Sequence, residues 1–314
     1  MVSGCGEEPA ASQSISHVYT DRSARVRAPV VPELLASTWT GARECAYGVR
    51  LIAMTDRFPV LMYHRIESAS CPVVAEVERS WAVPLAEFER QMNRLREAGR
   101  VGVSMEQIHG TLASRERVPP EWVGITFDDG NQSDYRHALP VLVEHGFRAT
   151  FFVCGERIGA EVPETQLKEM LSAGMHIGSH AMRHRFMTSL DAREEESELT
   201  ASRAALEAIL GSPVVHFAPP GGRWSGRTRA ALRRAGYVAV STSRYGFNPA
   251  HTANFAYCRL PVVRATSIST FDTMMNCERL KLWRGYARAA AADAARLVMG
   301  EGLYARARTT GKDR

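Results

Sequence analysis

Residues 125–135 read ITFDDGNQSDY, and this stretch carries two adjacent carboxylates at the end of an apolar run. Consecutive strand residues point to opposite faces, so Asp128 and Asp129 could face one cavity only if the strand ended there. Gly130 would let the chain turn at that point. Because Asp-Gly is also a common turn, the stretch alone predicts either a simple turn after a strand or one half of a metal site.

The segments on both sides of this stretch alternate between strand and helix patterns. Parallel neighbours need a crossover long enough to return to the same edge, so the alternation predicts one α/β domain with a barrel-like architecture. Short apolar runs predict strands at 58–63, 122–127, 148–153, 175–179, 214–218, 237–242 and 257–263. Helical spacing and stop signals predict helices at 85–98, 134–145, 164–173, 191–210, 226–235 and 279–298.

A second motif, GSHAMRH at 178–184, follows one of the predicted strands. His180 and His184 are four residues apart, so a helical turn would place both imidazoles on one side, where they could grip one ion. Together with one carboxylate of residues 125–135, they would form a set of one carboxylate and two imidazoles with open positions for water and substrate.

The cysteines and the hydropathy restrict the location and the class of the protein. Six cysteines are scattered without a C-x-x-C pair, which argues against a thiolate zinc site or a compact disulfide framework. No window approaches the roughly 18–20 apolar residues of a membrane span, and no secretion signal is visible. We therefore expect a cytoplasmic or membrane-proximal protein.

The net charge is +5, and the basic excess collects after residue 278. Such a segment favours either peripheral contact with an anionic membrane surface or a solvated amphipathic helix with a basic tail. Nucleic acid is not an expected partner, because the basic residues do not alternate with aromatics or fall in a recognised binding motif. The oligomeric state is left open by the sequence.

Three segments are expected along the chain. Residues 1–56 are rich in Ser, Ala, Pro and charge without a sustained period, and we expect a largely disordered extension there. Residues 57–275 would form the barrel, and residues 276–314 a C-terminal helix and a basic tail.

Four segments resemble, in order and spacing, the polysaccharide deacetylases of carbohydrate esterase family four. They are VLMYHRI at 60–66, ITFDDGNQSDYRHALPVLVEHGFRATFFV at 125–153, EMLSAGMHIGSHAMRH at 169–184 and FAPPGGRWSGRTRAALRRAGY at 217–237. The stretches CRLPVV at 258–263 and GEGLYARAR at 300–308 look like members that accompany bacterial exopolysaccharide synthesis. The resemblance implies a distorted TIM-like barrel with fewer than eight regular strands, and hydrolysis of N-acetyl groups on an amino sugar or its polymer.

The resemblance also implies roles for individual residues. Asp129, His180 and His184 match the metal ligands of the family, and Asp128 matches its general base. A divalent ion would activate the attacking water and polarise the acetyl carbonyl; Zn²⁺ is the first choice, and Fe²⁺, Co²⁺ or Ni²⁺ also suit these ligands. The backbone N–H of Gly221, where the family usually has an aromatic residue, would help to hold the oxyanion, and a plain tight turn is the alternative there.

The sequence departs from the family pattern at several positions. Ala218 stands where the family often has an arginine that orients the base, and Arg223 is a candidate substitute. The late motif that supplies a histidine as general acid is not found. His64, at the end of the first strand, is therefore the candidate for a substrate contact or proton donor, and a histidine that caps the backbone is the alternative.

Two other functions compete with the deacetylase. The same scaffold could hydrolyse a different non-peptide C–N bond, because fold alone does not fix the substrate. A non-catalytic glycan-binding member is the second alternative, which the missing late motif favours and the presence of all four Asp and His residues opposes.

Overall fold

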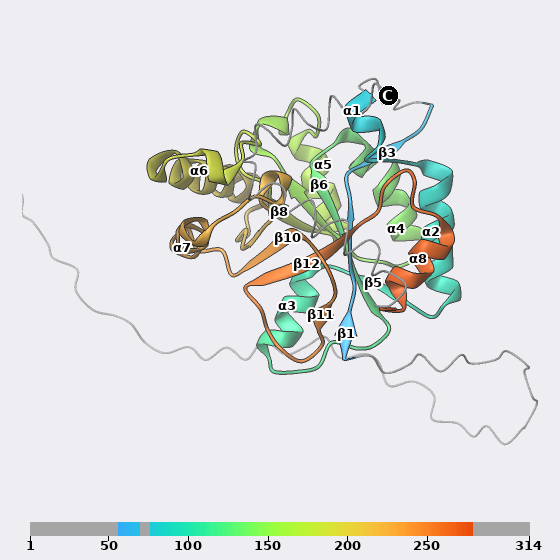
Figure 1. Cartoon of the computed structure of the whole chain (residues 1–314). Helices are drawn as coiled ribbons and strands as arrows, with labels where there is room; N and C mark the ends of the chain where they lie inside the picture. The colour runs from blue at the N-terminus through green and yellow to red at the C-terminus, as the bar shows by residue number, and fades with distance from the viewer. Residues whose placement is uncertain (1–55, 70–75, 279–314) are drawn as a thin grey trace, which may run out of the picture. The chain divides into compact units, whose positions relative to one another are not determined.

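The computed structural model describes residues 56–69 and 76–278 (Figure 1). Nearly all of the predicted N-terminal extension and the predicted helix over 279–298 lie outside these residues. None of the described helices is long and apolar enough to cross a membrane.

Seven parallel strands close into a barrel. The ring runs β2, β12, β10, β9, β8, β7 and β6, and it closes because Leu61 of β2 pairs with Ile125 of β6. The first residues of β6 pair instead with β5, which stands outside the ring. The strands are β2 (Val60–Tyr63), β5 (Val101–Val103), β6 (Trp122–Asp129), β7 (Thr150–Val153), β8 (His176–Ser179), β9 (His216–Phe217), β10 (Ala239–Tyr245) and β12 (Ala256–Pro261). This is the distorted TIM-like barrel with fewer than eight regular strands that the family resemblance implies.

Helices cover the outside of the barrel (Figure 1). α2 contacts α4 and α8, whereas α6 contacts α5 and α7. The helices are α1 (Glu76–Arg79), α2 (Leu85–Glu97), α3 (Met105–Ala113), α4 (Leu139–Glu144), α5 (Glu164–Ser172), α6 (Ala192–Leu210), α7 (Gly226–Arg234) and α8 (Ile268–Met275). Short helical turns lie at η1 (Asp134–Ala138), η2 (Gly155–Arg157), η3 (Met187–Ser189) and η4 (Pro220–Gly222), and two small pairings join β1 (Arg57–Phe58) to β11 (Asn248–Pro249) and β3 (Arg65–Glu67) to β4 (Ala82–Pro84).

The ends of α6 show how local sequence fixes an element. Asp191 caps the first turn by accepting from the N–H groups of Arg193 and Glu194, and the Glu194 side chain returns a bond to the Asp191 N–H. This reciprocal pair satisfies backbone donors that the helix itself leaves unbonded. The helix ends at Gly211, whose φ of 66° is left-handed and suits glycine. The predicted helix over 191–210 is thereby confirmed.

Aromatic packing decides which residues of β6 face the barrel interior. The ring of Phe127 stacks between Tyr63 and Phe151 of the two neighbouring strands, with centroids 5.2 and 4.7 Å away. It also meets Phe88 of α2 edge-on, so Phe127 faces the helical layer. Because strand side chains alternate, Asp128 on the same strand must face inward.

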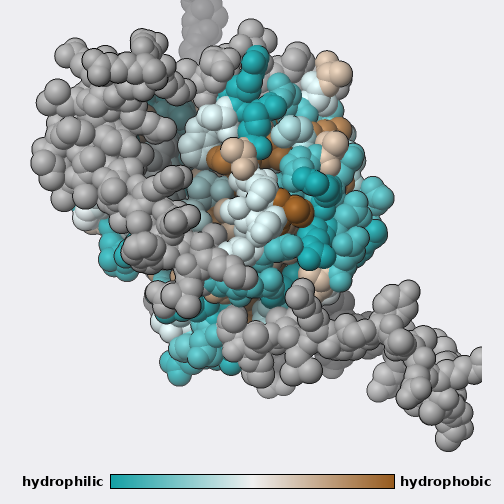
Figure 2. All heavy atoms as spheres, turned by 45° about the vertical axis from the view of Figure 1, so that its right-hand side comes forward, coloured by the Kyte–Doolittle hydropathy of each residue, from teal (hydrophilic) through white to brown (hydrophobic). Residues whose placement is uncertain are grey.

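The described surface carries few large exposed hydrophobic side chains. Figure 2 shows one face on which hydrophilic residues surround scattered hydrophobic ones. Among the described residues, the exposed large hydrophobics are Trp81, Val101, Val143, Phe186 and Val238. The two aromatic members of this set prove to line the same pocket.

Candidate active site

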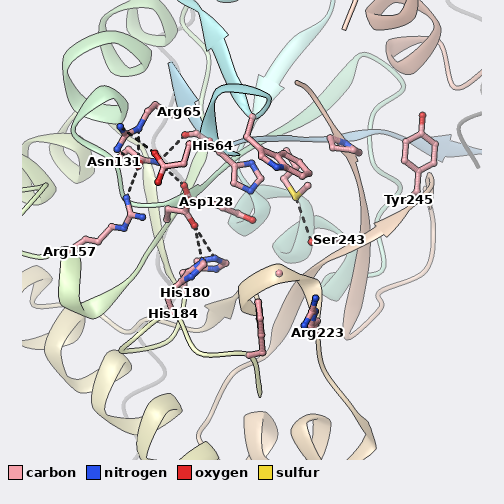
Figure 3. Close-up of a pocket in the computed structure, with 17 residues that line it drawn as sticks. His64, Arg65, Asp128, Asn131, Arg157, His180, His184, Arg223, Ser243 and Tyr245 are labelled. Atoms are coloured by element: carbon pink, nitrogen blue, oxygen red, sulfur yellow. Dashed lines mark hydrogen bonds and ion pairs between the residues drawn. The ribbon is translucent and has the colours of Figure 1, made fainter. Parts of the chain in front are cut away.

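Three side chains that can bind a metal meet at the carboxyl ends of β6 and β8 (Figure 3). Oδ1 of Asp129 lies 3.3 Å from Nε2 of His180 and 3.1 Å from Nε2 of His184. One ligand atom of each residue lies within 4.8 Å of those of the other two. One carboxylate and two imidazoles are a donor set that divalent transition metals accept, so these residues could hold one ion.

The backbone at the end of β6 lets both carboxylates reach one pocket. Asp129 has a φ of 85° and Gly130 a φ of 76°, so the strand stops and the chain turns. A Cβ at Gly130 would meet Cγ1 of Val153 at 2.9 Å, which explains why glycine stands there. Asp128 and Asp129 consequently line the same pocket. The turn and the candidate metal site are therefore one feature.

The segment between the two histidines is not the helical turn that their spacing predicts. Ala181 and His184 have φ values of 64° and 52°, and residues 180–184 form an irregular loop. The buried carboxylate of Glu198 on α6 holds this loop, because its Oε2 accepts from the N–H groups of Met182 and Arg183 at 2.9 and 2.8 Å. The two imidazoles still converge, but tertiary bonds rather than helical periodicity bring them together.

The hydrogen bonding of His180 leaves a ligand atom available. Its Nδ1 lies 2.8 Å from the carbonyl oxygen of Ala218. A carbonyl oxygen only accepts, so Nδ1 carries the proton and Nε2 of the neutral ring has a lone pair. That lone pair faces Asp129. Fixing the tautomer in this way is how proteins commonly prepare histidine for a metal, and the donor set therefore fits a divalent ion.

Asp128 is held by an arginine from the last strand of the barrel. Arg259 of β12 donates to both carboxylate oxygens, at 2.6 Å to Oδ1 and 2.7 Å to Oδ2. The same guanidinium donates to Oγ1 of Thr126 at 3.1 Å and to the carbonyl of Thr242 at 2.9 Å. Arg259 is fully buried. A bidentate pair of this kind fixes the plane of the carboxylate as well as its charge.

This pair corrects one prediction and reveals a residue that sequence reasoning missed. Arg223 was the candidate for orienting the base, but its guanidinium carbon lies 4.0 Å above the ring centre of Phe186, and Asp128 receives its bidentate contact from Arg259. Arg259 takes that place. A signal for it existed, because CRLPVV puts a charged residue inside an otherwise apolar strand, where a charge needs a buried partner.

Both carboxylates are ionised near neutral pH. Burial raises the pKa of Asp128, but Arg259 and His180 lower it more, and the net pKa is below its ordinary value. Burial also raises the pKa of Asp129, while the contacts of its carboxylate with the imidazoles of His180 and His184 bring it well below the ordinary value.

Gly221 also lines the pocket, in a conformation that favours glycine. Its φ is 61°, and a Cβ there would meet Cε1 of Phe186 at 2.7 Å. The ring of Phe186 thus occupies the space that a side chain at position 221 would need. The role of the Gly221 N–H toward an oxyanion stays a prediction.

His64 borders the same pocket, beside Trp81. The two ring centres are 4.7 Å apart. Burial lowers the pKa of His64, and although Asp128 and Asp129 raise it, the net pKa is below its ordinary value. Among the residues that the structure describes, its buried Nδ1 has no hydrogen-bond partner, so the alternative of a ring that caps the backbone through Nδ1 has no support. A role in proton donation stays a prediction.

The pocket that joins these residues has a volume of about 420 Å³, within the usual range for ligand sites. Trp81 and Phe186, 40% and 37% exposed, lie on its walls. Sequence reasoning did not identify either, because exposed aromatics resemble core aromatics in a linear sequence. Asn131, Arg65 and Arg157 also line the pocket and were likewise missed.

Comparison with known proteins identifies the family to which the chain belongs. The family model described as polysaccharide deacetylase matches residues 115–240. YxkH of Bacillus subtilis, which its name assigns to the polysaccharide deacetylases, is 30% identical over 217 residues, covering 68% of this chain and 75% of YxkH. The chain belongs to the polysaccharide deacetylase family. It is therefore an enzyme that acts on a carbon–nitrogen bond other than a peptide bond.

Two further known proteins are similar to this chain, one in sequence and one in fold. A chitin deacetylase of Pestalotiopsis is 30% identical over 135 residues, which cover 43% of this chain and 45% of that enzyme. The solved structure of the Streptococcus pyogenes deacetylase PplD, in complex with acetate, covers 70% of this chain and 98% of its own, with 24% identity and a TM-score of 0.63. The latter likeness shows the shared barrel.

Proposed function

We propose that this family member is a divalent-metal-dependent deacetylase that removes N-acetyl groups from an amino sugar in a saccharide or polysaccharide. The observation that carries the proposal is the meeting of Asp129, His180 and His184 beside an ionised carboxylate, Asp128. A bound ion would lower the pKa of a water molecule and polarise the acetyl carbonyl. Zn²⁺ remains the first choice, with Fe²⁺, Co²⁺ and Ni²⁺ as alternatives.

Asp128 is the proposed general base. It must be ionised to take a proton from the attacking water, and the bidentate contact with Arg259 supports this state. Because Arg259 occupies both oxygens in the plane of the carboxylate, the orientation of Asp128 is fixed before substrate arrives. Such pre-organisation removes a reorganisation cost from the reaction.

Gly221 and His64 are proposed to act on the two other atoms of the amide. The Gly221 N–H would donate to the carbonyl oxygen as negative charge develops there. His64 would deliver a proton to the leaving nitrogen. Both residues line the pocket that holds Asp128 and Asp129, which supports these roles.

The two exposed aromatic residues support a saccharide as substrate. Trp81 and Phe186 offer flat apolar faces to the pocket, and a sugar ring presents a matching apolar face. Arg223 backs the Phe186 ring and fixes its orientation. The link to exopolysaccharide synthesis depends on CRLPVV and on GEGLYARAR; the second of these lies outside the described residues, and the link stays a prediction.

Metal analysis together with acetate release tests the proposal. Wild-type protein should bind one divalent ion per chain by elemental analysis and release acetate from N-acetylglucosamine oligomers. Asp129→Ala should weaken metal binding and lower acetate release, each by more than about 100-fold, because it removes a ligand and not merely a residue that orients one. Glu106→Ala, which removes an exposed carboxylate of α3, is the matched control and should leave both unchanged.

The result that contradicts the proposal is stoichiometric metal without acetate from any N-acetylated saccharide. Release of ammonia or an acid from cyclic imides or ureides would then identify a different C–N bond. Calorimetric binding of the oligomers without turnover would instead identify a glycan-binding protein.

A further inference from the structure

A second polar cluster lies on the wall of the pocket next to the candidate metal site (Figure 3). Oδ1 of Asn131 accepts from Nη2 of Arg65 at 3.1 Å and from Nη1 of Arg157 at 2.7 Å. Arg65 comes from β3 and Arg157 from the turn after β7. We call these two residues the arginine pair.

Asn131 has a fixed orientation. Its Nδ2 donates to the carbonyl oxygens of His64 and Asp128, at 3.2 and 3.3 Å. An amide whose NH₂ group faces two carbonyls must turn its oxygen the other way. The oxygen therefore faces the arginine pair, and the two guanidinium groups are held together before any ligand binds.

In the described part of the chain, the arginine pair has little negative charge to balance it. One neutral oxygen serves as the acceptor for two cations. Glu78 and Glu161 approach only Arg65, at 3.8 and 3.9 Å, and their side chains are 54% and 40% exposed, so solvent screens both contacts. Within residues 56–69 and 76–278, no carboxylate oxygen lies within 4.0 Å of the Arg157 guanidinium.

The other carboxylates of this region are already engaged. Asp128 receives both of its charged bonds from Arg259, and Asp129 faces the two imidazoles. Asp134 accepts from the backbone N–H of Asn131, and burial raises its pKa well above the ordinary value. Among the described residues, none of these three carboxylates lies within 4.0 Å of the Arg65 or Arg157 guanidinium, although the charges of both arginines lower the pKa of Asp134.

We propose that the arginine pair binds an anionic group of the substrate, a carboxylate or a phosphate ester, carried close to the N-acetylated sugar. This inference rests on the proposed deacetylase function and names the class of saccharide that the site accepts. Guanidinium groups present paired N–H donors that match the oxygens of both anions. Asn131 joins the arginine pair to the backbone of His64 and Asp128, so the anion would bind beside the reacting amide.

Kinetics on three substrates test this inference with metal-loaded protein. The substrates are a neutral N-acetylglucosamine oligomer, an alternating N-acetylglucosamine–glucuronate oligosaccharide of equal length, and N-acetylglucosamine 1-phosphate. Wild type should show the highest kcat/KM on one of the two acidic substrates. The favoured substrate shows whether the arginine pair binds a carboxylate or a phosphate. Arg157→Gln should lower kcat/KM for that substrate by about 10- to 100-fold, mainly through KM, since it removes a charged hydrogen bond. Its activity on the neutral oligomer should change less than about threefold.

Two further variants separate binding from structure. Arg157→Lys keeps the charge but loses the planar fork, and should lie between wild type and Arg157→Gln. Arg185→Gln removes an equal charge from the Glu194 contact outside this pocket, and should leave the preference unchanged. If wild type shows no preference for either acidic substrate, or if Arg157→Gln lowers all three activities equally, the pair only positions Asn131 and the inference is wrong.

A binding measurement keeps the inference testable if the proposed function fails. Should no substrate release acetate, calorimetry can compare N-acetylglucosamine 1-phosphate and glucuronate with neutral N-acetylglucosamine on the same protein. Tighter binding of an anion that disappears in Arg157→Gln supports the anionic site without the reaction. Equal binding of all three sugars contradicts it.

Discussion

The two ends of the barrel each carry histidines, but in opposite surroundings. His180, directly after the last residue of β8, meets a carboxylate and has one nitrogen prepared for a ligand. His176, the first residue of the same strand, packs against His216 with ring centres 4.6 Å apart, and His216 packs against His109 at 5.7 Å. Among the described residues, no carboxylate contributes to the pKa of His176 or His216.

The difference teaches that the neighbour, and not the histidine itself, decides the chemistry. Burial lowers the pKa of His176 to about 4 and that of His216 well below its ordinary value, so both rings are neutral at physiological pH. They serve as packing. At the other end, Asp129 gives two imidazoles a shared negative partner, which is the condition for holding a cation.

The largest expected effect on stability comes from breaking the ion pair between Arg259 and Asp128. Arg259→Met should lower the free energy of unfolding by about 3–5 kcal/mol, because it leaves the charge of Asp128 buried without its partner. Urea unfolding monitored by circular dichroism measures this, and acetate release should fall as well. The double variant Asp128→Leu with Arg259→Met removes both charges and should regain much of the stability without activity. A single variant as stable as wild type would show that the pair contributes little to the fold.

The next effect concerns His176, at the opposite end of the barrel, and the loss of stability at low pH. The folded-state pKa of His176 is about 4, below the ordinary 6.5, so the unfolded state binds more protons between these values. The stabilising contribution is therefore complete above about pH 6.5 and is lost as the pH falls toward 4, by about 3 kcal/mol in total. His176→Gln should lose less stability than wild type between pH 7 and pH 4.

Denaturation curves at several pH values measure this difference. His251→Gln, at an exposed position, is the control and should follow the wild-type pH dependence. Parallel curves for His176→Gln and wild type would mean that the histidine cluster does not oppose protonation.

The smallest effect on stability is expected for two glycines with left-handed backbone, one inside the candidate site and one outside it. Gly221 and Gly146 have φ values of 61° and 66°, but only at Gly221 would a Cβ meet another side chain, Phe186. Alanine at either position should cost about 1–2 kcal/mol from the left-handed backbone. Gly221→Ala alone should also lower kcat, by about tenfold or more, as the proposed oxyanion donor shifts. Equal kcat values for the two variants would remove Gly221 from the mechanism.

Much of the fold follows from local sequence, and the exceptions have physical reasons. The predicted strands and the helices at 85–98, 164–173, 191–210 and 226–235 all occur, because each has an apolar pattern and a clear stop. Several elements were not predicted, among them β5, α3 and α8. β5 has three residues, α3 contains Gly110, and α8 contains β-branched residues, so the local preference for each element is weak even though Ser104 and Ser267 cap the two helices.

The candidate site likewise has residues that the sequence indicates and residues that only the tertiary structure reveals. Asp128 and Asp129 are adjacent, and His180 and His184 lie within one motif, so sequence spacing alone indicates that they belong together. Arg259 is 131 positions from Asp128 and reaches it only through the order of the strands. The 180–184 loop was misassigned as helical because its hydrogen bonds go to Glu198 on a different element.

The position of β12 in the ring has a consequence for the order in which a newly made chain can become active. β12 lies between β10 and β2, and it brings Arg259 with it. A ribosome-bound chain that has emerged only as far as β10 holds Asp128, Asp129 and both histidines of the candidate metal site, yet it has a gap in its ring and lacks the guanidinium that pairs with Asp128. The chain can therefore become active only after β12 has been synthesised. A product truncated before residue 256 should be an open sheet without hydrolytic activity.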